Sequence, residues 1–264
     1  MRFALFENNK IEASKGAKGF CPSCGSELIA RCGEFKIKHW AHKGNRNCDP
    51  WWENETDWHR SWKNNFPVDW QEYSFTDNLT NEKHIADVHT IHGIVIEFQH
   101  SHINPQERIS REKFYKNMVW VVDGTRLKRD YTRFLKGQKD ILRTNQHGRY
   151  IVQFPDECFP SNWLGSLVPV IFDFRGMESI SEPNDLRNYL FCLLPNKDKL
   201  DSTLVIMSRE SFINSAINGE LLKRQEKQQV QKTQPLQQNI TIKRREPTHY
   251  YDPRKGRFVK RKRF

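Results

Sequence analysis

Hydrophobic and polar residues alternate most clearly between residues 84 and 101, where the pattern predicts two short strands joined by a turn at 91–93. Successive side chains of a strand point to opposite faces. Glu97 and Gln99 therefore share one face of the second strand with Val95. The residues predicted to face a core on its other side are Ile94, Ile96 and Phe98.

The pattern elsewhere in the first half predicts alternating strands and helices. The elements are a leading strand at 2–6, a helix at 51–66, a strand at 68–75, a crossover helix at 105–116 and a buried strand at 118–122. Pro105 suits the first turn of the crossover helix. A strand, a crossover helix and a further strand form a βαβ unit, which implies a parallel pair. We therefore predict an α/β fold with a mixed sheet flanked by helices.

The second half continues with a charged helical connector at 125–146 and further strands. These strands are predicted at 150–154, 167–174, 190–194 and 203–207, and Ser208 is the predicted N-cap of a final helix that ends near residue 222. The region either extends the first sheet or forms a separate lid or interaction domain. Cys158 and Cys192 are interpreted as small core residues.

The net charge of +11 is concentrated in the last part of the chain. Residues 223–264 contain 14 Lys and Arg against 3 Asp and Glu, so the rest of the chain is neutral overall. This tail is Gln-rich and has few apolar residues, so we expect it to be disordered. It would gather nucleic acid without reading sequence; a solubility tail or a contact to another anionic partner are the alternatives. The expected contact residues are Lys243, Arg244, Arg245, Arg254, Lys255, Arg257, Lys260, Arg261, Lys262 and Arg263.

Two carboxylates in the alternating segment suggest a metal site. Asp87 lies near the start of the first strand, and folding of the hairpin brings it beside Glu97. Oxygen ligands on a rigid sheet suit a hard divalent cation such as Mg²⁺. Each residue alone has a simpler explanation, because Asp at a strand start often caps a turn and a strand Glu can pair with an Arg.

A helix upstream adds polar residues on one face. At helical spacing Glu55, His59 and Lys63 lie on the same side, with Trp58 and Trp62 as a neighbouring stripe that can anchor the helix on the sheet. Taken alone, this is a surface charge pattern beside a buried Trp seam. Together with the two strand carboxylates, it indicates that Glu55 faces the metal site.

The first fifty residues contain four of the six cysteines, in a pattern typical of zinc. A Cys-x2-Cys turn followed by Gly forms a tight thiolate knuckle, and a second ligand pair closes a tetrahedral site. The expected structural zinc ligands are Cys21, Cys24, His39 and His42, with Cys48 as the substitute for a histidine and Cys32 as a weaker one. Reduced structural thiols or a redox dithiol are the alternatives. The cysteine distribution and the absence of a signal-peptide pattern or a long apolar run favour a cytoplasmic protein with no membrane segment.

Several of these motifs resemble the competence protein CoiA-like family, a branch of the PD-(D/E)xK nucleases. The matching stretches are Ala-Asp-Val at 86–88, Ile-Glu-Phe-Gln-x-Ser-x-Ile at 96–103, Glu-Thr-x-x-His-x-x-x-Lys at 55–63, Cys-Pro-x-Cys-Gly at 21–25 and His-Trp-Ala-His at 39–42. Gln99 stands where the superfamily usually has Lys, and the CoiA-like branch carries Gln there as well. Glutamine cannot act as a base or carry charge.

The resemblance implies a PD-(D/E)xK restriction-endonuclease-like core with an N-terminal zinc-ribbon-like module. The expected divisions are a zinc module at 1–50, a nuclease core with its connector at 51–146, an α/β region of unknown role at 147–222 and the tail at 223–264. Asp87 and Glu97 would hold Mg²⁺ or Mn²⁺. The other expected catalytic residues are Glu55, His59, Lys63 and Gln99.

The resemblance implies a metal-dependent nuclease that hydrolyses DNA in competence, recombination or defence, with recombination or defence proteins as further partners. An alternative interpretation is a non-catalytic accessory protein of recombination that binds DNA and keeps the nuclease fold. Gln99, in place of Lys, favours this interpretation. The retained Asp87 and Glu97 speak against it. A zinc-ribbon adaptor that binds protein partners is a third interpretation, and it leaves the carboxylates unexplained.

Overall fold

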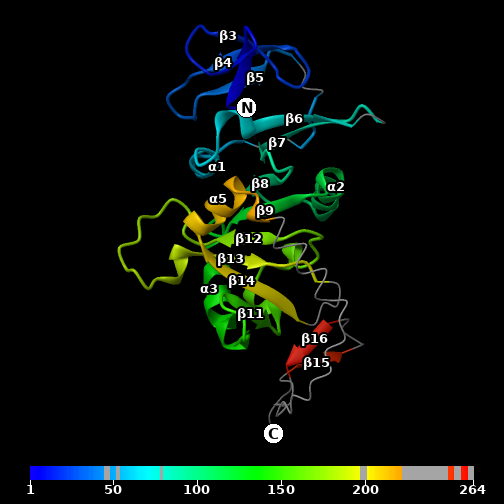
Figure 1. Cartoon of the computed structure of the whole chain (residues 1–264), viewed down its shortest axis with the longest axis vertical. Helices are drawn as coiled ribbons and strands as arrows, with labels where there is room; N and C mark the ends of the chain where they lie inside the picture. The colour runs from blue at the N-terminus through cyan, green and yellow to red at the C-terminus, as the bar shows by residue number, and fades with distance from the viewer. Residues whose placement is uncertain are drawn as a thin grey trace. The chain divides into compact units, whose positions relative to one another are not determined.

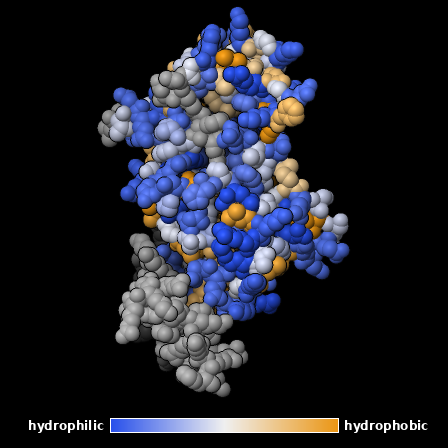
Figure 2. Space-filling model, turned by 180° about the vertical axis from the view of Figure 1, so that it is seen from behind, coloured by the Kyte–Doolittle hydropathy of each residue, from blue (hydrophilic) through white to orange (hydrophobic). Residues whose placement is uncertain are grey.

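The computed structural model describes residues 1–44, 48–51, 54–77, 80–196 and 201–221, together with the backbone of 249–252 and 257–260. The chain forms two compact units, Met1–Arg224 and Gln225–Phe264. In the first unit, the strands form two sheets, and helices pack against the larger one (Figure 1). Figure 2 shows a mostly hydrophilic surface with scattered hydrophobic residues, because most large apolar side chains of the described residues lie in the cores.

The N-terminal sheet is antiparallel and contains five strands in the order β2-β1-β3-β4-β5. Its strands are β1 (Phe3–Phe6), β2 (Asn9–Glu12), β3 (Lys18–Phe20), β4 (Glu27–Arg31) and β5 (His39–His42). One face of this sheet is buried around Trp40, together with Cys21 and Cys48. Gly19 crosses close to Trp40 and Ala4, where any side chain would clash. The small core of this module therefore includes candidate metal ligands.

The large sheet contains nine strands in the order β10-β11-β14-β13-β12-β9-β8-β7-β6. The strands are β6 (Gln71–Thr76), β7 (Lys83–His89), β8 (Val95–Gln99), β9 (Met118–Asp123), β10 (Ile141–Arg143), β11 (Arg149–Val152), β12 (Val170–Asp173), β13 (Tyr189–Leu193) and β14 (Ser202–Ser208). β8, β9 and β12 run parallel to one another, and the other pairs are antiparallel. The predicted βαβ unit is confirmed, and the second-half strands extend this sheet.

Helices cover both faces of the large sheet. The helices are α1 (Asp57–Lys63), α2 (Pro105–Tyr115), α3 (Lys128–Gly137), α4 (Pro155–Cys158) and α5 (Arg209–Ile217), with short 3₁₀ turns η1 (Val68–Trp70), η2 (Gln138–Asp140), η3 (Ser161–Trp163) and η4 (Leu186–Asn188). α1 and α5 pack through Trp58, Trp62 and Phe212 on one core. α2 and α3 pack through Tyr115 and Phe134 on the core of the opposite face. Apolar strand residues alternate between these two cores, which is why the strands are buried on both sides.

Two helices are shorter than the sequence pattern predicts. α1 begins at Asp57, because the Thr56 hydroxyl accepts from the N–H of His59 and His59 reaches back to the N–H of Thr56 as a capping box. α5 ends at Ile217 instead of near residue 222, because Asn218 and Gly219 close it, Gly219 with a left-handed φ of 71°. Ser208 caps α5 as predicted, and α2 ends one residue before its predicted end.

A single buried carboxylate anchors α1 to the second half of the chain. Asp173, at the end of β12, accepts hydrogen bonds from the indole N–H groups of Trp58 at 2.9 Å and Trp62 at 3.1 Å. Arg209 at the start of α5 pairs with the same carboxylate at 2.5 Å. The second half of the chain therefore supports the helix that carries His59 and Lys63, and Glu55 lies two residues before its start.

In the second unit, β15 (His249–Asp252) and β16 (Arg257–Lys260) form an antiparallel pair. The rest of the tail for which we predict disorder lies outside the described residues, as do eight of the ten predicted nucleic-acid contacts. In the parts that the structure describes, no helix is both long enough and apolar enough to cross a membrane.

Candidate metal centres

The first candidate centre lies where β7 and β8 separate. The two strands pair at Val88–Ile96 and His89–Val95, and then side chains take over the hydrogen bonding. The N–H of Asp87 donates to Glu97 Oε1 at 3.2 Å, and the N–H of Phe98 donates to Asp87 Oδ2 at 3.0 Å. Where the two strands separate, the carboxylates of Asp87 and Glu97 therefore lie together. Each one accepts a hydrogen bond from a backbone N–H of the neighbouring strand.

A pocket with a cavity volume of about 60 Å³ opens beside these carboxylates, which is room for a few water molecules. It is lined by Met1, Asp49, Trp51, Glu55, His59, Lys63, Glu72, Ile85, Asp87, Glu97 and Arg111. Five of the six predicted catalytic residues thus meet in one pocket. The sixth, Gln99, is not part of the lining, and its amide donates to the carbonyl and hydroxyl of Ser101 at 3.2 Å.

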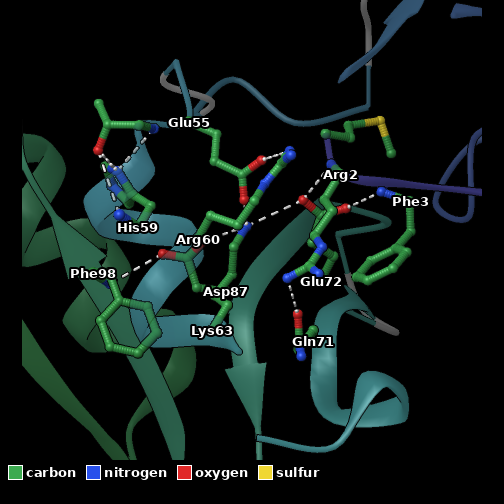
Figure 3. Close-up of polar contacts among 12 residues, drawn as sticks. Arg2, Phe3, Glu55, His59, Arg60, Lys63, Gln71, Glu72, Asp87 and Phe98 are labelled. Atoms are coloured by element: carbon green, nitrogen blue, oxygen red, sulfur yellow. Dashed lines mark hydrogen bonds and ion pairs between the residues drawn. The ribbon is translucent and has the colours of Figure 1, made fainter. Parts of the chain in front are cut away.

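Lys63 connects three carboxylates at this site (Figure 3). Its Nζ lies 2.5 Å from Glu55, 3.3 Å from Glu72 and 3.7 Å from Asp87. Burial disfavours the ammonium, but the three negative charges outweigh it and raise the pKa of Lys63 above its usual range. Burial likewise opposes ionisation of Glu55, yet the charge of Lys63 lowers the pKa of Glu55 overall. The pocket therefore contains a permanent, buried ion network.

Glu72 joins the N-terminal sheet to this network. Its carboxylate accepts the N–H groups of Arg2 at 2.7 Å and Phe3 at 2.9 Å. Burial opposes its charge, but Lys63 and these donors lower the pKa of Glu72 to about 2. Glu72 has a left-handed φ of 47°, which is rare for a residue with a side chain. At this residue the pairing of β6 with β7 is interrupted, between the pairs Gln71–Val88 and Tyr73–Ala86. The distorted backbone thus serves to direct one carboxylate toward both β1 and Lys63.

Glu97 has a different environment from the other carboxylates. Arg111 on α2 donates to its Oε2 at 3.1 Å, and the same guanidinium donates to the carbonyl of Trp51 at 2.5 Å and pairs with Glu107. Burial and the negative charge of Asp87 nonetheless raise the pKa of Glu97 to about 8. Two close carboxylates that repel each other, one of them buried, form a donor set that a divalent cation would satisfy.

We expect Glu97 to make the free energy of unfolding fall as pH rises. A pKa of about 8 lies above the ordinary 4.5, so the folded protein holds a proton that the unfolded chain has released in this window. The stabilisation is complete below the ordinary pKa and is lost as pH passes through the raised one. Urea denaturation of metal-free Glu97→Gln between about pH 5 and 9 should lack this decline. The exposed Glu34→Gln is the control, and a Glu97→Gln profile that parallels the wild type would disprove the raised pKa.

The second candidate centre is formed by Cys21, Cys24, His42 and Cys48, whose ligand atoms all lie within 4.8 Å of one another. Cys24 Sγ lies 3.4 Å and Cys48 Sγ 3.6 Å from His42 Nε2, and Cys21 Sγ lies 3.8 Å from Cys48 Sγ. The Gly25 N–H closes the turn on the Cys21 carbonyl at 2.9 Å. Three thiols and an imidazole at this spacing fit a tetrahedral Zn²⁺. The cluster could therefore bind zinc as a closed structural site.

The structure places His39 outside this cluster, and Cys48, the predicted substitute for a histidine, lies in its place. Residues His39–His42 form strand β5, in which positions three apart face opposite sides. His42 shares a face with the buried Trp40, whereas the Nδ1 of His39 interacts with the carbonyl of Ile37 at 2.8 Å. The His-x2-His spacing converges on a helix but not on a strand.

We expect purified wild-type protein to carry about one zinc ion per chain, held by these four residues. Cys24→Ser should lose most of this zinc and lower the unfolding temperature, because metal binding contributes directly to the stability of a small module. Atomic emission and thermal unfolding measure the two effects. Cys32→Ser, outside the cluster, is the matched control; equal zinc content in both variants would contradict the assignment.

Six described residues of the pocket lining are not among the predicted site residues: Met1, Asp49, Trp51, Glu72, Ile85 and Arg111. Asp49 directly follows Cys48 and Trp51 lies two residues further along the chain. Trp51 stacks on His84 with ring centroids 3.2 Å apart. Arg111 lies on α2, a helix that the sequence pattern predicts. The pattern does not show that Arg111 contacts Glu97 in β8. No sequence motif was identified at these positions.

Comparison with known families agrees with this architecture. The family described as competence protein CoiA, N-terminal domain, matches residues 4–50, and the family described as competence protein CoiA, nuclease-like domain, matches residues 55–159. No curated protein and no solved structure gives a significant match. The fold and site thus define a protein with a nuclease-like domain. The chain belongs to the competence protein CoiA-like family.

Proposed function

We propose that this protein is a Mg²⁺- or Mn²⁺-dependent nuclease that hydrolyses phosphodiester bonds of DNA. The observation that carries the proposal is the pair of carboxylates at the strand split, Asp87 and Glu97, held beside the buried ammonium of Lys63. A site built only for stability would gain nothing from two adjacent carboxylates, one of which resists ionisation.

Asp87 and Glu97 would hold the metal ion. When bound there, a divalent ion polarises a phosphoryl oxygen and lowers the pKa of a coordinated water. Arg111 and the N–H of Phe98 keep the two carboxylates in place. Their positions are therefore set before substrate arrives, which is the condition for efficient electrostatic catalysis.

Lys63 supplies the positive charge that Gln99 cannot. Its ammonium lies beside Asp87, although it projects from a helix and not from the strand of Glu97. Glu55, bound to Lys63 and Arg60, would complete the metal site or orient the attacking water. His59 lines the same pocket and would stabilise charge that develops on the phosphate. Gln99 would contact the water or a phosphate oxygen only if its amide left Ser101.

DNA would be held by the basic tail and the zinc module. The tail supplies a charge-based, salt-sensitive contact, with Arg257 and Lys260 on β16 and the other predicted contacts outside the described residues. Roles in bacterial competence, recombination or defence all suit a cytoplasmic nuclease of this family, with proteins of those processes as partners.

Incubation of the purified protein with labelled single-stranded DNA, duplex DNA and RNA tests the proposal. We expect cleavage with Mg²⁺ or Mn²⁺ and none with EDTA. Binding without cleavage in every metal condition would overturn the nuclease and favour the accessory protein that retains the fold. The contacts of Gln99 with Ser101, away from the pocket lining, are the observation that supports this second candidate.

A further inference from the structure

A second polar group lies on the α1 side of the large sheet, next to the pocket but outside its lining. His100 directly follows β8, and its Nδ1 lies 2.7 Å from Oδ2 of Asp123 at the end of β9. The Asp123 side chain is 3% exposed, whereas that of His100 is 36% exposed. A buried carboxylate therefore holds a histidine whose ring reaches solvent.

The carboxylate of Asp123 is itself fixed on its other oxygen. Thr125 donates to Oδ1 through its N–H at 2.8 Å and through its hydroxyl at 2.6 Å. The turn after β9 thus locks Asp123, which in turn selects the imidazole tautomer with the proton on Nδ1. This arrangement orients the ring so that, as an imidazolium, it can donate from Nε2 to an anionic ligand.

His100 lies next to His59, a residue of the pocket lining, so both side chains could contact the same ligand. Its ring centroid lies 6.1 Å from that of His59, which lines the pocket. Trp58 fills the space behind both rings, 6.4 Å from His100 and 5.3 Å from His59. The two histidines therefore lie next to each other, the buried His59 at the pocket and the partly exposed His100 outside its lining. The distance between the two rings is comparable with the spacing of successive phosphates on a nucleic acid strand.

We propose that His100, oriented by Asp123, binds a phosphate of the nucleic acid strand next to the one held in the Asp87–Glu97 pocket. The inference rests on the proposed function for its substrate. It makes His100 a catalytic residue that contacts the strand and Asp123 a positioning residue that acts through it. The Asp123 carboxylate would stabilise the imidazolium form of His100, whose Nε2–H can donate to a phosphate oxygen and align the strand, so that the neighbouring phosphate enters the pocket in register.

His100→Gln tests the contact by activity. A lost hydrogen bond to a charged phosphate should lower kcat/KM for cleavage by about tenfold or more. His147→Gln removes an exposed histidine between β10 and β11 and should leave the rate unchanged. An unchanged rate in His100→Gln, in an enzyme that cleaves DNA, would overturn the inference and leave the nuclease intact.

Histidine NMR on the full-length protein tests the contact without cleavage. A short DNA hairpin with a single-stranded arm is titrated in the presence of Ca²⁺, and the ring resonances of the wild-type His100 are followed. We expect the His100 signal to move with the hairpin and the His147 signal to stay. Asp123→Asn should reduce the His100 response, which a merely structural role of Asp123 would not do. A His100 signal that ignores the hairpin contradicts the inference, even if the wild type proves not to cleave and the proposed function fails.

Discussion

Lys63→Met should destabilise the protein by about 3–5 kcal/mol, the usual cost of breaking a buried ion pair on one side. The side chain of Lys63 is 2% exposed and lies within 4 Å of Glu55, Glu72 and Asp87. Methionine fills nearly the same volume but leaves these carboxylates without their shared cation. Arg60 still pairs with Glu55, and the N–H groups of Arg2 and Phe3 still donate to Glu72, so the fold need not be lost entirely.

The loss of stability in Lys63→Met should be larger at neutral pH than in acid. In the wild type, Lys63 lowers the pKa of Glu72 to about 2 against the effect of burial. Without Lys63, Glu72 would take up a proton more readily, which relieves part of the penalty in acid. Urea denaturation should therefore show a larger deficit at neutral pH than at low pH. Lys113→Met on the exposed side of α2 is the control, and equal stabilities of the two variants would contradict the ion network.

Asp173→Ala should lower the free energy of unfolding by about 3–5 kcal/mol. We also expect it to disturb the candidate site, although Asp173 does not line the pocket. Asp173 is fully buried and accepts the indoles of Trp58 and Trp62 and the guanidinium of Arg209. Each donor left without an acceptor in the interior costs about 1–3 kcal/mol. Because both indoles belong to α1, the helix that carries His59 and Lys63 should loosen.

Denaturation curves measure the stability of Asp173→Ala, and Trp fluorescence reports on the environment of α1. The exposed Asp201→Ala is the matched control. A stable Asp173→Ala variant with unchanged fluorescence would show that α1 does not depend on β12 and α5. The matched nuclease-like region ends at residue 159, so this variant also tests whether later strands support the site.

The alternation of β8 and the helical spacing of α1 predicted that Glu97, His59 and Lys63 face one site, but the same alternation also predicted Gln99, which is not part of the pocket lining. Asp87, Glu97 and Lys63 lie on regular elements, where the side-chain direction follows from position. Glu72 was not predictable, because its role depends on a left-handed backbone and on N–H groups 69 and 70 residues away. Arg111 lies on a predicted helix, but its partner Glu97 is set by how α2 packs on the sheet.

The cysteine cluster illustrates the same limit. Cys21 and Cys24 form a local turn that the sequence specifies, so the spacing alone identified them. The choice between His39 and Cys48 required the knowledge that 39–42 is a strand, where His39 and His42 diverge. The second-half strands were recognised as strands, but their addition to the large sheet depends on the parallel pairing of β12 with β9, which no local pattern encodes.

The most direct test of the metal-dependent site is the single-turnover cleavage rate of the Asp87→Asn/Glu97→Gln double variant on the DNA that the wild type cleaves best. Both substitutions keep the shape of the side chains and remove the charges that would bind the metal ion. A metal site formed by Asp87 and Glu97 predicts that cleavage falls by at least about a hundredfold, while DNA binding and the folded structure persist and Glu34→Gln cleaves as the wild type does. Cleavage by the double variant at the wild-type rate would contradict it.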